Sequence, residues 1–153
     1  MEIERKFLLG ETPDLTNTAY TEISQGYLSY EPEIRIRKDA SKFYITKKSE
    51  GNLTREEEEI EITSELYNIL SDLIDGREIK KTRYYVSIDK YIAEVNFYHE
   101  ELEGFSMIEV EFPNEEEANS FSIPNWFGEE VTHLEEYKNK NLARYGLQNI
   151  KTK

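Results

Sequence analysis

Residues 33–48 read EIRIRKDASKFYITKK, and this stretch predicts two antiparallel β-strands joined by a short turn. Successive side chains of a strand point to opposite faces of the sheet. Arg35 and Arg37 therefore share one face, while the neighbouring isoleucines share the other. Lys48 in the second strand repeats this alternation. The hairpin has one mainly apolar face for a core and one face that carries Arg35, Arg37 and Lys48 together with Tyr44 and Thr46.

The same alternation recurs along most of the chain. Strands are predicted over residues 2–9, 19–29, 33–38, 42–48, 53–62, 78–88, 91–98 and 106–112. Helical spacing of apolar residues predicts a helix over 64–75, capped by Thr63 or Ser64. Two further helices are expected, one from Asn114 to about residue 121 and one from a capping box at Thr132 to about Gly146. Residues 1–153 are predicted to form a single α+β domain with a mostly antiparallel sheet or barrel.

Composition narrows the class of protein. The chain has 153 residues with a net charge of −13, so its overall field repels nucleic acid and anionic membrane surfaces. The aromatic share of 12% argues against disorder. The sequence has no cysteine, which excludes disulfides and thiolate metal sites and fits a reducing compartment. With neither a signal peptide nor an apolar run of membrane length, a cytoplasmic location is expected.

The charged faces carry like charges in pairs two residues apart. The pairs are Glu2/Glu4, Arg35/Arg37, Glu57/Glu59, Lys81/Arg83 and Glu109/Glu111. An ordinary solvated sheet face is one interpretation. However, neighbouring like charges repel, which favours an interpretation in which groups of opposite sign bridge them. Paired carboxylates can share hard cations such as Mg²⁺, Mn²⁺ or Ca²⁺, and paired arginines can clamp a multiply charged anion.

A barrel with its charged faces inward would bring both kinds of pair together. Seven acidic side chains would then balance seven basic ones: Glu2, Glu4, Glu57, Glu59, Glu94, Glu109 and Glu111 against Lys6, Arg35, Arg37, Lys48, Arg55, Lys81 and Arg83. Such a lumen could accept a polyanion together with divalent metals.

Six short motifs occur in an order typical of a known family. They are EIERKFL at 2–8, RIR at 35–37, ITKKSEG at 45–51, RxExE at 55–59, KTR at 81–83 and EVEF at 109–112. With them the sequence resembles the CYTH superfamily, the triphosphate tunnel metalloenzymes, and is most similar to short bacterial inorganic triphosphatases. The resemblance implies an eight-stranded antiparallel β-barrel that forms a tunnel, with a charged lumen and helices packed outside.

The resemblance also implies roles for individual residues. Substrate phosphates would be bound by Lys6, Arg35, Arg37, Lys48, Arg55, Lys81, Arg83 and Lys138, and Mg²⁺ or Mn²⁺ by Glu2, Glu4, Glu57, Glu59, Glu109 and Glu111. Glu57, Glu59, Arg35 and Arg37 are the predicted catalytic residues. The chain departs from the family at Asn96, where an aspartate is common. Asparagine keeps an acceptor but loses the charge, which argues against a metal role for position 96 or weakens a second metal site.

The predicted activity is metal-dependent hydrolysis of the terminal phosphate of inorganic tripolyphosphate, with nucleoside triphosphates as further possible substrates. The sequence has no glycine-rich phosphate loop, so side chains must bind the phosphates. Two alternatives stay open: an adenylate cyclase of the same superfamily, and a non-catalytic binder of polyphosphate or nucleotide. The expected partner is a small triphosphate, without nucleic acid or membrane, and the chain is expected to be a monomer or a homodimer.

Overall fold

In the part of the chain that the structure describes, nine strands form one antiparallel sheet with the order β5-β4-β3-β2-β6-β7-β8-β1-β9. The computed structural model describes residues 3–48, 57–148 and 150. The strands are β1 (Ile3–Leu9), β2 (Tyr20–Tyr30), β3 (Glu33–Asp39), β4 (Lys42–Lys48), β5 (Glu57–Ile62), β6 (Ile79–Ile88), β7 (Tyr91–Tyr98), β8 (Ser106–Phe112) and β9 (Phe127–Glu130).

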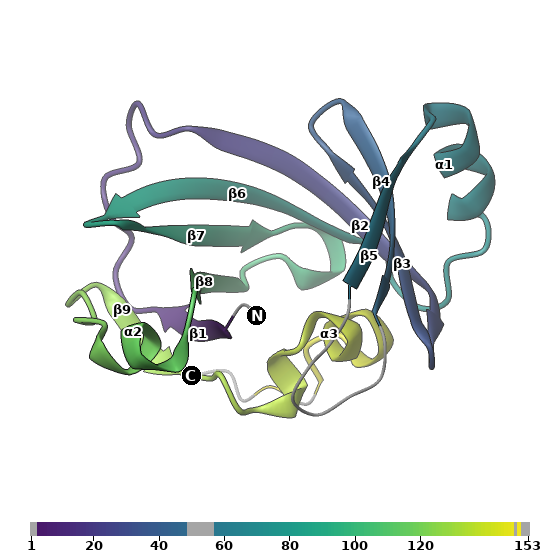
Figure 1. The fold of residues 1–153 in the computed structure, drawn as a ribbon. Coiled ribbons are helices and arrows are strands. Elements are labelled where there is room, and N and C mark those ends of the chain that lie inside the picture. Colours follow the sequence, from purple (N-terminus) through teal and green to yellow (C-terminus); the bar gives the residue numbers. More distant parts are fainter. Residues whose placement is uncertain (1–2, 49–56, 149, 151–153) are drawn as a thin grey trace.

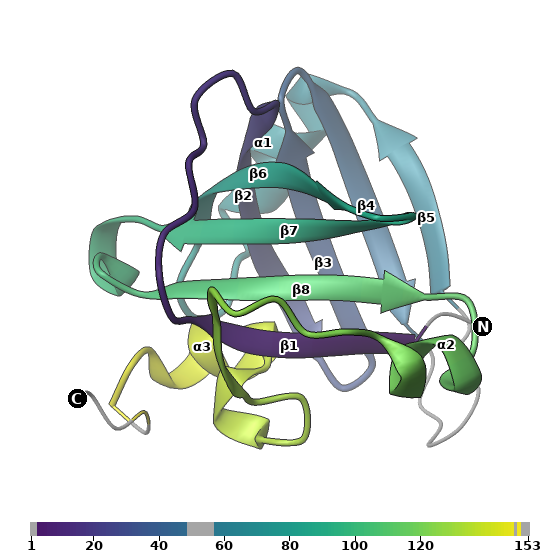
Figure 2. The ribbon, with the colours of Figure 1, turned by 90° about the vertical axis from the view of Figure 1, so that its left-hand side faces the viewer.

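The long strand β2 makes the sheet turn back on itself. Its first half pairs with β6 over Tyr20–Gln25, whereas its second half pairs with β3 from Ile23 to Tyr30. One wall therefore consists of β6, β7, β8, β1 and β9, and the other consists of β3, β4 and β5. Figures 1 and 2 show β6, β7, β8 and β1 on one side and β3, β4 and β5 on the other. The two walls face each other across the curve of this sheet (Figure 1).

The helices lie outside the sheet. They are α1 (Ser64–Ser71), α2 (Glu115–Ser120) and α3 (Asn139–Tyr145), with short 3₁₀ turns η1 (Glu100–Leu102) and η2 (Glu135–Tyr137). Helix α1 packs on β3 and β4, α2 on β1 and β8, and α3 on β2. Within the described residues, no helix combines the length and the hydropathy that a membrane crossing requires.

Two apolar clusters hold the curved sheet. One lies on its outer side beneath α2 and β9 and includes Phe7, Ile108 and Phe127. The other lies at the α3 end of the fold, where Tyr27 and Leu142 are among the buried residues. Because apolar packing occupies the outer side and one end, the remaining part of the inner side is left to charged residues.

The prediction of an antiparallel sheet with helices outside it is confirmed, with three differences. The structure adds a ninth strand, β9, which extends the sheet beyond β1. Hydrogen bonds between the described strands do not close the sheet, whose edges are β5 and β9. The capping box at Thr132 is wrong, because the last helix begins at Asn139.

Three hydrogen bonds, two of them between residues far apart in the chain, explain the helix boundaries. The Thr132 hydroxyl accepts a hydrogen bond from the Lys6 backbone N–H at 3.0 Å, so it ties the segment after β9 to β1 instead of starting a helix. Thr63 does cap α1, as expected, since its hydroxyl accepts from the Leu66 N–H at 3.1 Å. That helix ends at Ser71 rather than at residue 75, and the Asp75 N–H instead bonds the Tyr27 carbonyl at 2.8 Å.

Candidate active site

Eleven of the predicted site residues lie on the strands that form the two walls, and we call their shared side of the sheet the inner face. They are Glu4 and Lys6 on β1, Arg35 and Arg37 on β3, Lys48 on β4, Glu57 and Glu59 on β5, Lys81 and Arg83 on β6, and Glu109 and Glu111 on β8. In the strand register, Glu94 of β7 lies opposite Glu109 of β8, and Asn96 of β7 lies opposite Arg83 of β6.

On the β3 wall, each arginine faces a glutamate across β4. The Arg35 guanidinium lies 3.8 Å from the Glu57 carboxylate, and that of Arg37 lies 3.5 Å from Glu59. Thr46 of the intervening strand donates a hydrogen bond to Glu59 at 3.1 Å. The Nε atoms of both arginines are buried and have no hydrogen-bond partner. These loose pairs leave guanidinium donors free for an anion.

On the opposite wall, Lys81 and Arg83 of β6 are buried, with 1% and 8% of their surface exposed. The Arg83 guanidinium lies 3.4 Å from Glu94, which compensates its charge. The Lys81 ammonium lies 5.4 Å from the centre of the Tyr98 ring, within the range of a cation–π contact. Burial, and then the neighbouring Arg83, lower the pKa of Lys81 to about 7. Two adjacent buried cations are costly without a nearby anion.

Asn96 connects these groups from the middle of β7. Its side chain is fully buried, and Oδ1 accepts from Arg83 Nε at 2.9 Å. Its amide nitrogen approaches the carbonyls of Glu94 and Met107, both at 3.2 Å, and the Glu109 carboxylate at 3.5 Å. An aspartate here could not donate to three acceptors. Asn96 therefore orients Arg83 and Glu109, a role that only a group with both donor and acceptor can fill.

Acidic side chains gather where β1 meets β8. Glu4 lies opposite Glu111 and Lys6 opposite Glu109 in the strand register, and the Lys6 ammonium is 3.7 Å from Glu4. Burial and then the charge of Glu109 raise the pKa of Glu4 to about 8. Burial would also raise the pKa of Glu109, but Lys81, Lys6 and Arg83 outweigh it and hold that pKa below its usual range. The pKa of Glu4 therefore lies above, and that of Glu109 below, the ordinary range of a glutamate.

The two walls are electrostatically coupled across the inner face. Lys48 lies 3.8 Å from Glu33. Burial and then Arg35 lower its pKa, while Glu4 on the distant strand β1 acts in the opposite direction. Likewise, the pKa of Glu94 is raised mainly by burial, and Arg37 of the other wall partly offsets this. Groups on strands that share no hydrogen bonds therefore influence one another's charge across the inner face.

Three predicted residues are not among those that the structure places on the inner face. Glu2 and Arg55 fall outside the described residues. Lys138 immediately precedes α3, and its ammonium lies 2.9 Å from the Glu135 carboxylate. The structure also adds inner-face residues that the sequence analysis missed, among them Gln25 and Tyr27 of β2. Because Gln25 and Tyr27 are two residues apart in a predicted strand, the sequence could have placed both on one face. However, a glutamine and a tyrosine between apolar residues resemble ordinary core residues.

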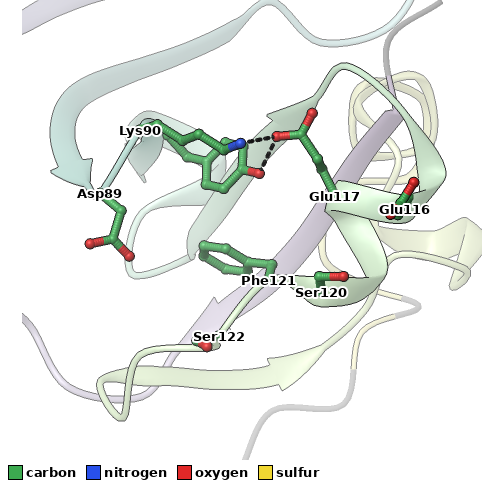
Figure 3. A pocket seen from close by; sticks show the side chains of 8 residues that line it. Asp89, Lys90, Glu116, Glu117, Ser120, Phe121 and Ser122 are labelled. Carbon is green, nitrogen blue, oxygen red and sulfur yellow. Dashed lines mark hydrogen bonds and ion pairs between the residues drawn. The ribbon is translucent and has the colours of Figure 1, made fainter.

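A separate hollow of 460 Å³ lies between the β6–β7 turn and α2 (Figure 3). Its central polar groups already bond one another, because Lys90 and the Tyr91 hydroxyl both reach the Glu117 carboxylate at 2.6 Å. Asp89 and Glu116 add further negative charge to its lining. A triphosphate would be repelled there, so the inner face is the candidate site.

The chain is similar in sequence to named proteins over nearly its whole length. No family model matches the chain. An inorganic triphosphatase of Nitrosomonas europaea is 40% identical over 93% of this chain and 96% of its own length. The chain belongs to the inorganic triphosphatase family of the CYTH superfamily. A second family member, the inorganic triphosphatase of Acetivibrio thermocellus, is 32% identical and covers 98% of this chain and 97% of its own length.

Solved structures show the same fold. The crystal structure of the inorganic triphosphatase NE1496 is 37% identical, with a TM-score of 0.74 over 94% of each chain. A protein from Hippeastrum with 18% identity and a TM-score of 0.52 covers 78% of this chain and 83% of its own length. At that identity the likeness concerns the fold alone. The triphosphatase family fold therefore includes both walls of the inner face.

Proposed function

We propose that the chain hydrolyses the terminal phosphate of inorganic tripolyphosphate, bound on the inner face. One observation carries the proposal: the inner face holds Lys81 and Arg83 almost without water, opposite two arginines with unpaired buried donors. A polyanion compensates such an arrangement better than water does, because it supplies several acceptor oxygens and the opposite charge together. The activity named for both curated relatives supports it.

The donors at the β1–β8 junction fit a hard divalent cation, Mg²⁺ or Mn²⁺. Glu4 lies opposite Glu111, and burial and the charge of Glu109 raise the pKa of Glu4, so a cation would replace a repulsion by attraction. No three carboxylate or histidine side chains of the described part are already gathered into a cation cage. Glu4, Glu109 and Glu111 would hold the metal, with Glu2 as a further candidate ligand.

The chain's own residues account for phosphate binding and charge neutralisation. Lys6, Lys48, Lys81 and Arg83 bind phosphate oxygens, and Arg35 and Arg37 neutralise the charge that develops on the transferred phosphoryl group. Glu57 or Glu59 accepts a hydrogen bond from the water that attacks the terminal phosphorus, whose anhydride P–O bond then breaks to give orthophosphate and pyrophosphate. When bound, the metal supplies further charge neutralisation and aligns the phosphates. Arg55 and Lys138 are proposed as additional phosphate contacts.

A product analysis tests the proposal. Purified protein with Mg²⁺ or Mn²⁺ is incubated with tripolyphosphate and, separately, with ATP. Orthophosphate should be released faster from tripolyphosphate, because the inner face supplies charges for phosphates and the sequence offers no identified site for a base. Cyclic AMP as the main product from ATP would support the cyclase instead. Binding of both compounds without any turnover, with either metal, would support a non-catalytic binder.

A further inference from the structure

We propose that Gln25 is a substrate-binding residue whose side-chain amide donates a hydrogen bond to a phosphate oxygen. The inference rests on the proposed function, since it concerns the same ligand on the same inner face. Gln25 lies in the middle of β2, the strand that joins the two walls. It is 2% exposed, and its amide nitrogen Nε2 is buried without any hydrogen-bond partner.

The surroundings of this amide are mostly cationic. Gln25 lies directly opposite Arg37 of β3 and opposite Ile79 of β6 in the strand register. One step along β2 in either direction on the same face, Ile23 pairs with Lys81 and Tyr27 pairs with Arg35. The amide thus lies among three cationic positions contributed by both walls.

The unpaired atoms identify the missing ligand as an acceptor. Within the described residues, four buried side-chain atoms have no hydrogen-bond partner, and three of them are nitrogen donors on the inner face: Gln25 Nε2, Arg35 Nε and Arg37 Nε. Leaving such a donor unpaired is costly in a folded protein, so native structures rarely keep one without a reason. A metal cation cannot satisfy an N–H group. The oxygens of a polyphosphate can satisfy all three.

Glutamine suits this position because it supplies a donor without a charge. A lysine or arginine at residue 25 would place another cation directly beside Arg37 and one step from Lys81 and Arg35. Their mutual repulsion would destabilise the ligand-free protein. The amide can still bond a phosphate oxygen, and a hydrogen bond to a charged acceptor is among the stronger ones. Gln25 would therefore strengthen tripolyphosphate binding at little electrostatic cost.

The test compares Gln25→Met with Gln148→Met. Methionine has a similar length and no donor, and Gln148, the other glutamine of the sequence, is exposed. Tripolyphosphate binding is measured by calorimetry in EDTA, and KM and kcat are measured with Mg²⁺. We expect Gln25→Met to weaken binding about tenfold or more, and Gln148→Met to leave it unchanged. The melting temperature of ligand-free Gln25→Met should stay level or rise, because an unpaired buried donor has been removed.

A merely structural glutamine predicts the opposite pattern. If Gln25→Met lowers the melting temperature by several degrees but binds tripolyphosphate like the wild type, the inference is wrong. A second variant, Gln25→Glu, covers the case in which methionine does not fold. Its carboxylate would pair with Arg37, so the ligand-free protein should be at least as stable while tripolyphosphate binds more weakly. Wild-type affinity in Gln25→Glu would also overturn the inference.

The same experiment separates this inference from the proposed function. If the wild type and Gln148→Met neither bind nor hydrolyse tripolyphosphate, the proposed function fails. If both bind and hydrolyse it, and the Gln25 variants do so equally well, only the role of Gln25 fails.

Discussion

Replacing Glu4 by glutamine should stabilise the metal-free protein, by an amount that grows with pH. Burial and the neighbouring Glu109 raise the pKa of Glu4 to about 8, whereas an unfolded glutamate titrates near pH 4.3. Between these values the folded protein keeps a proton that the unfolded chain releases. The stability of the wild type therefore falls as pH rises through this window, and the Glu4→Gln substitution removes that loss.

The magnitude follows from the pKa difference and from exposure. A difference of this size corresponds to about 5 kcal/mol if it were fully expressed. However, 33% of the Glu4 side chain is exposed, so water screens part of the interaction. We expect Glu4→Gln to raise the free energy of unfolding by about 2 kcal/mol at pH 8 and by little near pH 5.

The assay is urea unfolding in EDTA at pH 5, 6.5 and 8, followed by the fluorescence of the single tryptophan, Trp126. Glu11→Gln is the matched control, since Glu11 is exposed just after β1. Added Mg²⁺ should stabilise the wild type more than Glu4→Gln and so shrink the difference, because a ligand of the folded state shifts the unfolding equilibrium. A difference that stays constant between pH 5 and 8, or a less stable Glu4→Gln at pH 8, would refute the reasoning.

Three further predictions concern other parts of the site. Arg35→Ala and Arg37→Ala should each lower turnover of tripolyphosphate at least about tenfold with little change in the urea midpoint, and unchanged kinetics in both would contradict their role. Asn96→Leu should lower the free energy of unfolding by about 2–4 kcal/mol, because Arg83 and two backbone carbonyls lose hydrogen-bond partners. The control is Asn125→Leu at an exposed position, and an equally small loss of stability in both variants would contradict the structural role of Asn96. Deleting residues 1–6 should abolish both activity and cooperative unfolding, because β1 pairs with β8 and β9. The Lys6→Ala variant should stay folded and bind tripolyphosphate more weakly. Wild-type activity in the deletion variant would argue against β1 as part of the site.

Strand positions could be predicted because alternation depends on local sequence. The face shared by Arg35 and Arg37 follows from the period of two, and the structure places both on the inner face. The end of α1 and the start of α3 could not be predicted in this way. Thr132 has the sequence of a helix cap, but its hydroxyl bonds the backbone of Lys6, which is 126 residues away in the chain. A long-range contact of this kind overrides a local signal.

The candidate site shows the same division. Charged residues in like-sign pairs indicated the inner face, but the sequence could not show which pairs would meet. Asn96 looked like a lost metal ligand, whereas the structure shows a buried amide between Arg83 and Glu109. Gln25 gave no charge signal at all. Its significance depends on an unpaired nitrogen, and satisfaction of a donor can be judged only once all neighbouring strands are in place.

The distribution of charge explains how an acidic chain can bind an anion. With a net charge of −13, the outer surface repels large polyanions such as nucleic acids. Lys81 and Arg83 lie on the inner face, where Glu109 and Glu94 compensate them in the absence of a ligand. A short polyphosphate that enters competes with these carboxylates for the cations. A metal at Glu4, Glu109 and Glu111 would relieve that competition by engaging the carboxylates. Phosphate and metal binding should therefore be mutually reinforcing, so that tripolyphosphate binds more tightly with Mg²⁺ than in EDTA, and this gain should be smaller in Glu109→Gln.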